Sequence, residues 1–264
     1  MNVCCELAPR TGIVKLSVLF QLGKMKIMKL NQTLALVAGF TTALQLATAG
    51  NITGKVTLKG TPPTEKEITG ITDAACSAGH TTPMKTRFYV VGSGGELADT
   101  VVMLKGISGK STGAAAAPVL IDQKGCEYVP YVGAVQTGQK IAVKNSDQTM
   151  HNVHPSPANT AGGNKEENKA QFAGAADLSF TFPAAENFLK FKCDVHPWMF
   201  SYITVVDHPY FAVTGKDGAF TIKDVPAGKY KIVAMHRKAA PAGLEQDIEV
   251  TADGAKTDFA LEVK

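Results

Sequence analysis

The alternation of apolar and polar side chains along this chain is typical of many short β-strands. From residue 50 onward, apolar residues recur at every second position in short segments, which Gly, Pro and Asp-Gly pairs separate from one another. This period turns one face of a strand toward a core and the other toward solvent. We therefore predict an all-β protein built as a sandwich or barrel. The clearest predicted strands cover residues 140–144, 178–182, 189–193, 202–206, 220–222 and 230–232.

Two stretches of different composition divide the predicted strands. Residues 111–117 are rich in Ser, Gly and Ala and indicate a flexible junction, so we place a boundary near residue 117. Residues 155–176 are rich in Gly, Ala, Asn and Lys, which predicts a long surface loop. The expected division is an N-terminal β segment at 50–116, a central β domain at 117–207 and a C-terminal β domain at 208–264.

Residues 1–49 have the features of an upstream extension followed by a signal peptide. Lys26 and Lys29 precede the mostly apolar stretch 34–46, and Ala-Thr-Ala at 47–49 fits a small-residue cleavage site. An uncleaved anchor is the alternative, but this stretch is shorter than the roughly 20 apolar residues that a transmembrane helix needs. We expect a periplasmic or secreted protein with no stable membrane insertion after cleavage.

The net charge does not point to a particular class of partner. The formal charge of +4 arises entirely within residues 1–49, so the rest of the chain is formally neutral. A neutral domain gives no electrostatic reason to expect a nucleic acid partner.

Two short segments carry the residues that indicate metal chemistry. Cys193, His196 and Met199 have the spacing Cys-x-x-His-x-x-Met in a tight turn between two predicted strands. His151 follows the predicted strand 140–144, which can bring a second imidazole to them. A thiolate and a thioether are soft ligands suited to copper, and two His, one Cys and a distant axial Met form blue-copper electron-transfer sites. We therefore expect one copper ion at these four residues.

These segments resemble the ligand segments of the cupredoxins, most closely those of amicyanin and then plastocyanin. The resemblance covers residues 117–207 and implies a Greek-key β-sandwich with one type 1 copper. His151, Cys193 and His196 would be its equatorial ligands and Met199 its axial ligand. The motifs are His151-Asn152-Val153-His154 and the short loop Cys193-Asp194-Val195-His196-Pro197-Trp198-Met199.

The same resemblance assigns roles to the neighbouring residues. His154 would not be a ligand, although it would replace His151 if the strand slipped its register. The backbone near Asn152 would donate to the Cys193 sulfur, and the Asn152 side chain would brace the two ligand segments. His196 would expose its ring edge, with Pro197 and Trp198 as an apolar rim where a redox protein docks weakly. Trp198 stands where we expect Phe in amicyanin.

Several function classes remain in view. The ligand set favours a protein that carries single electrons between extracytoplasmic redox partners, and not an enzyme. A copper oxidase or nitrite reductase needs a second copper centre, usually with His-x-His pairs, and the sequence has none. The alternative is a copper-binding module for copper handling or for assembly of a larger redox complex. A storage protein would usually carry Met-rich or His-rich tracts, which are also absent.

Cys76 and Cys126 are the other cysteines after residue 50, and an oxidising compartment favours a disulfide between them. The alternative is a second metal site formed by Cys76, His80 and Cys126.

The C-terminal segment has a resemblance of its own. Residues 217–222 (Asp-Gly-Ala-Phe-Thr-Ile) and 225–230 (Val-Pro-Ala-Gly-Lys-Tyr) resemble carboxypeptidase regulatory-like, transthyretin-type β-domains. The resemblance implies a second, smaller β-sandwich made from 50–116 and 208–264, with the copper domain inserted between its strands, and a structural or binding role. The alternative is an N-terminal extension packed on the copper domain and a separate C-terminal module.

Overall fold

The computed structural model describes residues 48–263, so the predicted upstream extension and signal peptide lie outside the described residues except at their last two positions. The regular secondary structure of the described residues is almost entirely β-strand, which confirms the predicted all-β fold. Their helical elements are α1 (Ala74–Ala78) and the 3-10 turn η1 (Gly113–Ala115). Neither of these, nor any other stretch of the described chain, forms a helix long and apolar enough to cross a membrane.

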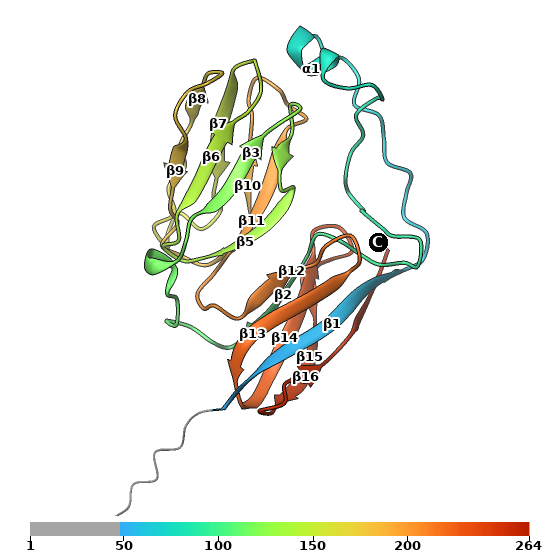
Figure 1. Cartoon of the computed structure of the whole chain (residues 1–264), viewed down its shortest axis with the longest axis vertical. Helices are drawn as coiled ribbons and strands as arrows, with labels where there is room; N and C mark the ends of the chain where they lie inside the picture. Colours follow the sequence, from blue (N-terminus) through green and yellow to red (C-terminus); the bar gives the residue numbers. More distant parts are fainter. Residues whose placement is uncertain (1–47, 264) are drawn as a thin grey trace, which may run out of the picture. The chain divides into compact units, whose positions relative to one another are not determined.

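Strands from both ends of the described chain pair to form one sandwich. The blue strand β1 lies beside orange and red strands from the opposite end (Figure 1). One sheet has the order β13-β1-β16, with β17 also paired to β1, and the other has the order β12-β2-β14-β15. The bounds are β1 (Ala49–Lys59), β2 (Thr100–Lys105), β12 (Phe211–Val213), β13 (Ala219–Pro226), β14 (Gly228–His236), β15 (Ala240–Val250), β16 (Ala255–Lys256) and β17 (Phe259–Glu262).

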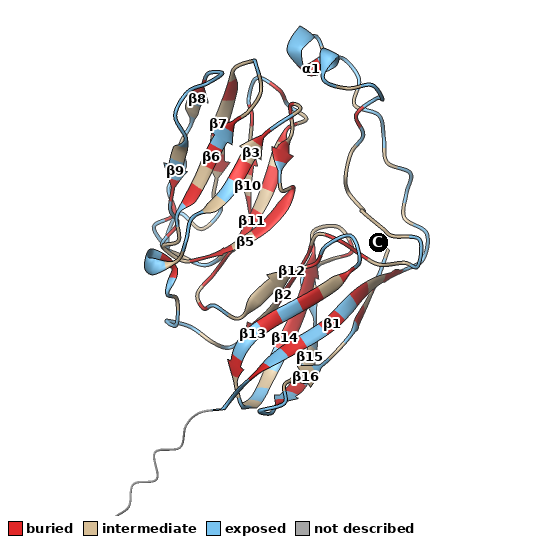
Figure 2. Cartoon of the chain, viewed as in Figure 1, coloured by how far each residue is buried: buried red, intermediate tan, exposed pale blue. Residues whose placement is uncertain are grey.

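The sequence pattern of β1 explains its place in this sandwich. Buried and exposed positions alternate along the strand (Figure 2), so Ile52 and Val56 enter the core while Thr53 and Lys55 face outward. Gly54 allows a close approach of neighbouring chain. A β-carbon at Gly54 would overlap the carbonyl oxygen of Thr257 and touch the ring of Phe220.

The central residues form a second sandwich of two sheets. Their orders are β5-β11-β10-β7-β8 and β4-β3-β6-β9, and apolar side chains from both inner faces form the core between them. The bounds are β3 (Val119–Gln123), β4 (Tyr128–Val129), β5 (Val132–Gln136), β6 (Ile141–Asn145), β7 (His151–Ser156), β8 (Lys169–Gln171), β9 (Leu178–Phe180), β10 (Glu186–Lys192) and β11 (Phe200–Val206). The predicted loop at 155–176 is partly wrong, because β8 lies within it as an edge strand paired with β7.

Residues 60–88 leave the sandwich of β1 and β2 as a two-limbed excursion, which we call the arm, with α1 toward its tip (Figure 1). Its limbs are joined where Ile68 N donates to Met84 O at 2.8 Å and Thr86 N donates to Lys66 O at 2.9 Å. The predicted N-terminal β segment at 50–116 therefore has its named strands only at β1 and β2 among the described residues.

Candidate metal centre

The strand pairing of the central sandwich brings the ligand segments together. His151 is the first residue of β7, and Cys193 directly follows β10. These strands are antiparallel neighbours, with Lys192 opposite His154, so His151 and Cys193 lie at the same end of the sheet. The Cys193–Met199 loop, which leads into β11, is closed by backbone hydrogen bonds. Cys193 N donates to Met199 O at 3.2 Å, and Met199 N donates to His196 O at 2.9 Å.

His151, Cys193 and His196 form one buried cluster. The two Nδ1 atoms of His151 and His196 are 2.9 Å apart, and the Cys193 Sγ is 3.7 Å from the Nδ1 of His196. The three side chains are at most 2% exposed. A first-row metal that binds nitrogen at about 2.0–2.1 Å and sulfur at about 2.3 Å holds its donors roughly this far from one another. The residues therefore fit a mononuclear soft-metal site.

Met199 is also buried, and it belongs to the same core cluster as Cys193. It lines a mostly apolar pocket of about 180 Å³ together with Trp198 and residues of the arm. The structure thus places the predicted axial ligand in the same loop as Cys193 and His196 and in the same core cluster as Cys193.

Hydrogen bonds to the Cys193 sulfur favour its ionised form. Burial alone would raise the pKa of this thiol, but hydrogen bonds from His151 and from backbone N–H groups outweigh burial and lower the pKa. Asn152 N donates to the sulfur at 3.2 Å and His196 N donates to it at 3.4 Å. Because the thiolate is the form that binds a metal, the protein prepares this ligand before metal arrives. Cys193 is the one unpaired cysteine in the described part of the chain.

A carboxylate lies near the outer nitrogen, Nε2, of each of the two imidazoles. His151 Nε2 donates to Asp147 Oδ2 at 2.9 Å, and the same carboxylate accepts the backbone N–H groups of Gly125 and Cys126 at 2.6 and 2.8 Å. Asp73 Oδ2 lies 3.4 Å from His196 Nε2. A carboxylate on the outer nitrogen of a ligand histidine fixes its tautomer and orientation, leaving Nδ1 free for a metal.

The two imidazole rings differ in their pKa values. Burial would lower the pKa of His151, but hydrogen bonds with Asp147 and Cys193 outweigh burial and raise it to about 9. Burial and the neighbouring charge of His151 instead lower the pKa of His196. His151 therefore holds a proton more strongly than His196 does.

The structure corrects the predicted exposure of His196. Its ring is 2% exposed because α1 covers the Nε2 edge, with Cys76 Sγ at 3.8 Å and Asp73 on the same side. Trp198 is half-buried and donates from Nε1 to Cys126 O at 3.1 Å, so it packs against the β3–β4 turn. Pro197 remains exposed.

The structure joins Cys76 and Cys126 in a disulfide. The alternative site with His80 does not form, because His80 Nε2 lies 2.7 Å from the carbonyl oxygen of Gly125 and the cysteine sulfurs are bonded to each other.

Two expectations about neighbouring residues differ in outcome. His154 stands apart from the cluster, between Asp194 and Glu166 at 2.7 Å from each. The expected bracing by Asn152 is wrong in detail. Its side chain donates to Asn168 at 3.0 Å, and Asn168 in turn donates to Asp194 at 2.6 Å, so the link between the ligand segments runs through Asn168.

Sequence reasoning missed three residues of this site. Asp147 precedes His151 by four positions, which is a weak local signal. Asp73 lies far from the ligand segments in the sequence, and the structure shows it as the N-cap of α1. The third is Tyr128, fully buried, whose hydroxyl lies against the carbonyl oxygens of Asn152 and Lys192 and so ties β7 to β10.

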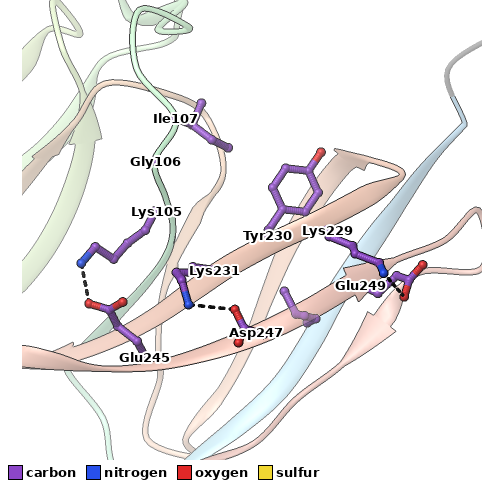
Figure 3. A pocket seen from close by; sticks show the side chains of 10 residues that line it. Lys105, Gly106, Ile107, Lys229, Tyr230, Lys231, Glu245, Asp247 and Glu249 are labelled. Atoms are coloured by element: carbon purple, nitrogen blue, oxygen red, sulfur yellow. Dashed lines mark hydrogen bonds and ion pairs between the residues drawn. The ribbon is translucent and has the colours of Figure 1, made fainter.

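A hollow of about 850 Å³ lies on the other sandwich, over β14 and β15 (Figure 3). Its lysines are paired with acidic residues across the strands, so no charged side chain among its lining residues is left without an opposite partner. We assign no function to it. The pairs are Lys105–Glu245, Lys231–Asp247 at 2.9 Å and Lys229–Glu249 at 3.9 Å.

No family model and no curated protein matches the chain. Among solved structures, the copper-containing nitrite reductase of Thermus scotoductus SA-01 is 18% identical over 34% of this chain and 22% of its own, with a TM-score of 0.30. An oxidised variant of amicyanin is 19% identical over 39% of this chain and 97% of its own, with a TM-score of 0.30. The purple cupredoxin of Nitrosopumilus maritimus is 19% identical over 33% of this chain and 98% of its own, with a TM-score of 0.28. At these TM-scores the matches carry no argument about the site, so its assignment rests on its own residues.

Proposed function

We propose that this protein binds one type 1 copper and carries single electrons between extracytoplasmic redox partners, without catalysis of its own. The observation that carries the proposal is the buried cluster of His151, Cys193 and His196, with Met199 in the same loop. Nitrogen and thiolate donors of this kind, with a thioether nearby, are the ligands of blue-copper sites. The extracytoplasmic location rests on the predicted signal peptide.

The chain holds these donors in a nearly fixed arrangement. Copper, when bound, supplies a one-electron change between Cu(I) and Cu(II). The backbone hydrogen bonds across the Cys193–Met199 loop and the pairing of β7 with β10 keep the donors in place, whichever oxidation state they face. Burial of the cluster excludes water. Little reorganisation would therefore accompany electron transfer.

A visible spectrum of the copper-loaded, oxidised chain tests the proposal. We expect an intense thiolate-to-copper band near about 600 nm. Cys193→Ser should abolish this band. His154→Gln is the matched control, because His154 lies close in sequence to His151 but outside the cluster, and it should keep the band. Absence of the band, or its survival in Cys193→Ser, would overturn the proposal.

A redox protein is proposed to dock weakly near His196 and Trp198. Because the His196 edge is covered, docking would use the exposed residues beside it, Pro197 and Val195, the latter 48% exposed. Val195→Asp and Trp198→Asp should slow electron transfer with the physiological partner, whereas Leu120→Asp, at an exposed residue in β3, should not. Unchanged rates in both loop variants would contradict this docking surface.

The covered histidine also favours a second candidate function. A copper module that serves copper handling or assembly of a larger redox complex, with no electron-transfer partner of its own, does not need an accessible ligand edge. Electron self-exchange of the isolated copper-loaded chain separates the two functions. Rapid self-exchange supports the carrier, and copper transfer to an acceptor protein without turnover supports the module.

A further inference from the structure

One covalent bond joins the arm to the metal centre, beside hydrogen bonds such as that of His80 with the carbonyl oxygen of Gly125. Cys76, in the middle of α1, is bonded to Cys126 in the turn between β3 and β4. The helix is too short to be stable alone, and its N-terminus is held by Asp73, whose Oδ1 accepts the N–H groups of Ala75 and Cys76 at 2.8 and 3.1 Å. The disulfide and the N-cap together give Asp73 a defined orientation.

The second oxygen of Asp73 faces the metal centre. Oδ2 accepts the hydroxyl of Thr149 at 2.9 Å and lies 3.4 Å from His196 Nε2. The other neighbour of Nε2 is the Cys76 sulfur, which is bonded in the disulfide and carries no hydrogen. Because both neighbours can only accept, Nε2 carries the proton and Nδ1 keeps a free lone pair toward His151 and Cys193.

The carboxylate at His151, that of Asp147, is connected to the same disulfide. Asp147 binds the backbone N–H groups of Gly125 and Cys126, and Cys126 is the disulfide partner of Cys76. The two carboxylates are therefore linked to each other through one turn, one disulfide and one helix N-cap. One of them, Asp147, is local to its histidine, whereas Asp73 reaches the site only because the arm is tied down.

We propose that Asp73 is a positioning residue of the copper site, held by the disulfide-tied arm against the outer nitrogen of His196. This inference rests on the proposed function, because it assigns a role toward the same copper. A carboxylate at this position keeps the imidazole in the metal-binding tautomer and makes it a stronger donor. A stronger nitrogen donor favours Cu(II) over Cu(I), so Asp73 lowers the reduction potential.

Asp73→Asn in the full chain is the sharpest test. Asparagine is as good an N-cap as aspartate, so α1 and the disulfide should persist, while the acceptor facing Nε2 loses its charge. Glu67→Gln is the matched control, since Glu67 is an exposed acid on the same arm. Loss of such a partner typically weakens metal affinity roughly 10- to 100-fold.

We expect Asp73→Asn to lower Cu(II) affinity by about tenfold or more relative to Cu(I), which raises the potential by about 59 mV for each factor of ten. Glu67→Gln should leave both affinities and the potential unchanged. Asp73→Glu should recover part of the loss. If Asp73→Asn matches Glu67→Gln while mass spectrometry shows the disulfide intact, the proposal is wrong.

A measurement without copper separates this inference from the proposed function. Nitrogen NMR of the copper-free chain should show His196 as the Nε2–H tautomer in the parent and a mixture in Asp73→Asn. If the tautomer shifts but no variant gives the blue band, the positioning role stands and the proposed function fails. If Asp73→Asn does not fold, the Cys76→Ala/Cys126→Ala variant supplies the test. It should shift the His196 tautomer and the potential in the same direction, and unchanged values there would overturn the proposal.

Discussion

Replacing both Cys76 and Cys126 with alanine should destabilise the central sandwich and uncover His196. The disulfide closes a loop with a sequence separation of 50 residues. The chain-entropy relation for such a loop gives a stabilisation of about 4 kcal/mol at 25 °C. The double variant should therefore unfold at a clearly lower denaturant concentration than the parent chain.

Fluorescence of Trp198 provides the assay. It is the only tryptophan in the chain and donates to the carbonyl of Cys126, so it reports on the central sandwich and not on the other one. Unfolding curves in urea should give a free energy of unfolding lower by about 4 kcal/mol in the double variant. Treatment of the parent with a reducing agent should give the same loss.

The control is built into the same pair of proteins, because a reducing agent should have no effect on the double variant. A second readout is the chemical reactivity of His196, which is 2% exposed in the parent and should become accessible once the arm is released. A loss of less than about 1 kcal/mol, well under the loop-entropy value, together with an unreactive His196, would refute the reasoning that the disulfide holds the arm in place.

Three further predictions concern other parts of the structure. Because the pKa of His151 is about 9, copper must displace a proton from this ring below that pH, so Cu(II) affinity should fall as the pH is lowered from about 9 to about 6. A pH-independent affinity in competition titrations would contradict this prediction. Burial lowers the pKa of His236 to about 4. The unfolded chain binds this proton first, so stability should fall by up to about 3 kcal/mol between about pH 6.5 and pH 4, and His236→Gln should flatten this part of the unfolding profile. Gly54→Ala places a methyl group against the Thr257 carbonyl and should lower the free energy of unfolding, measured by thermal unfolding, by about 1–3 kcal/mol. An unchanged free energy of unfolding would show that β1 can shift at that point.

Most residues of the candidate metal centre could be selected from the sequence because their signals are short-range. Cys193, His196 and Met199 lie in one turn, and the alternation before Cys193 already directs its sulfur inward. The all-β fold followed from the same kind of signal, since a period of two residues is set by the geometry of a strand. The β8 edge strand was missed because its surroundings have the composition of a loop.

Contacts between distant segments could be decided only by the tertiary structure. The Cys76 sulfur reaches His196 across 120 positions in the chain, and no local pattern specifies which surface a five-residue helix will cover. The resemblance therefore led us to expect an exposed ligand edge where the structure has a covered one. The alternation and the spacing of Cys193, His196 and Met199 are local features, so the sequence was enough to predict the strands and the candidate donors. The disulfide and long-range packing decided which side chains lie at the outer nitrogens of the two histidines.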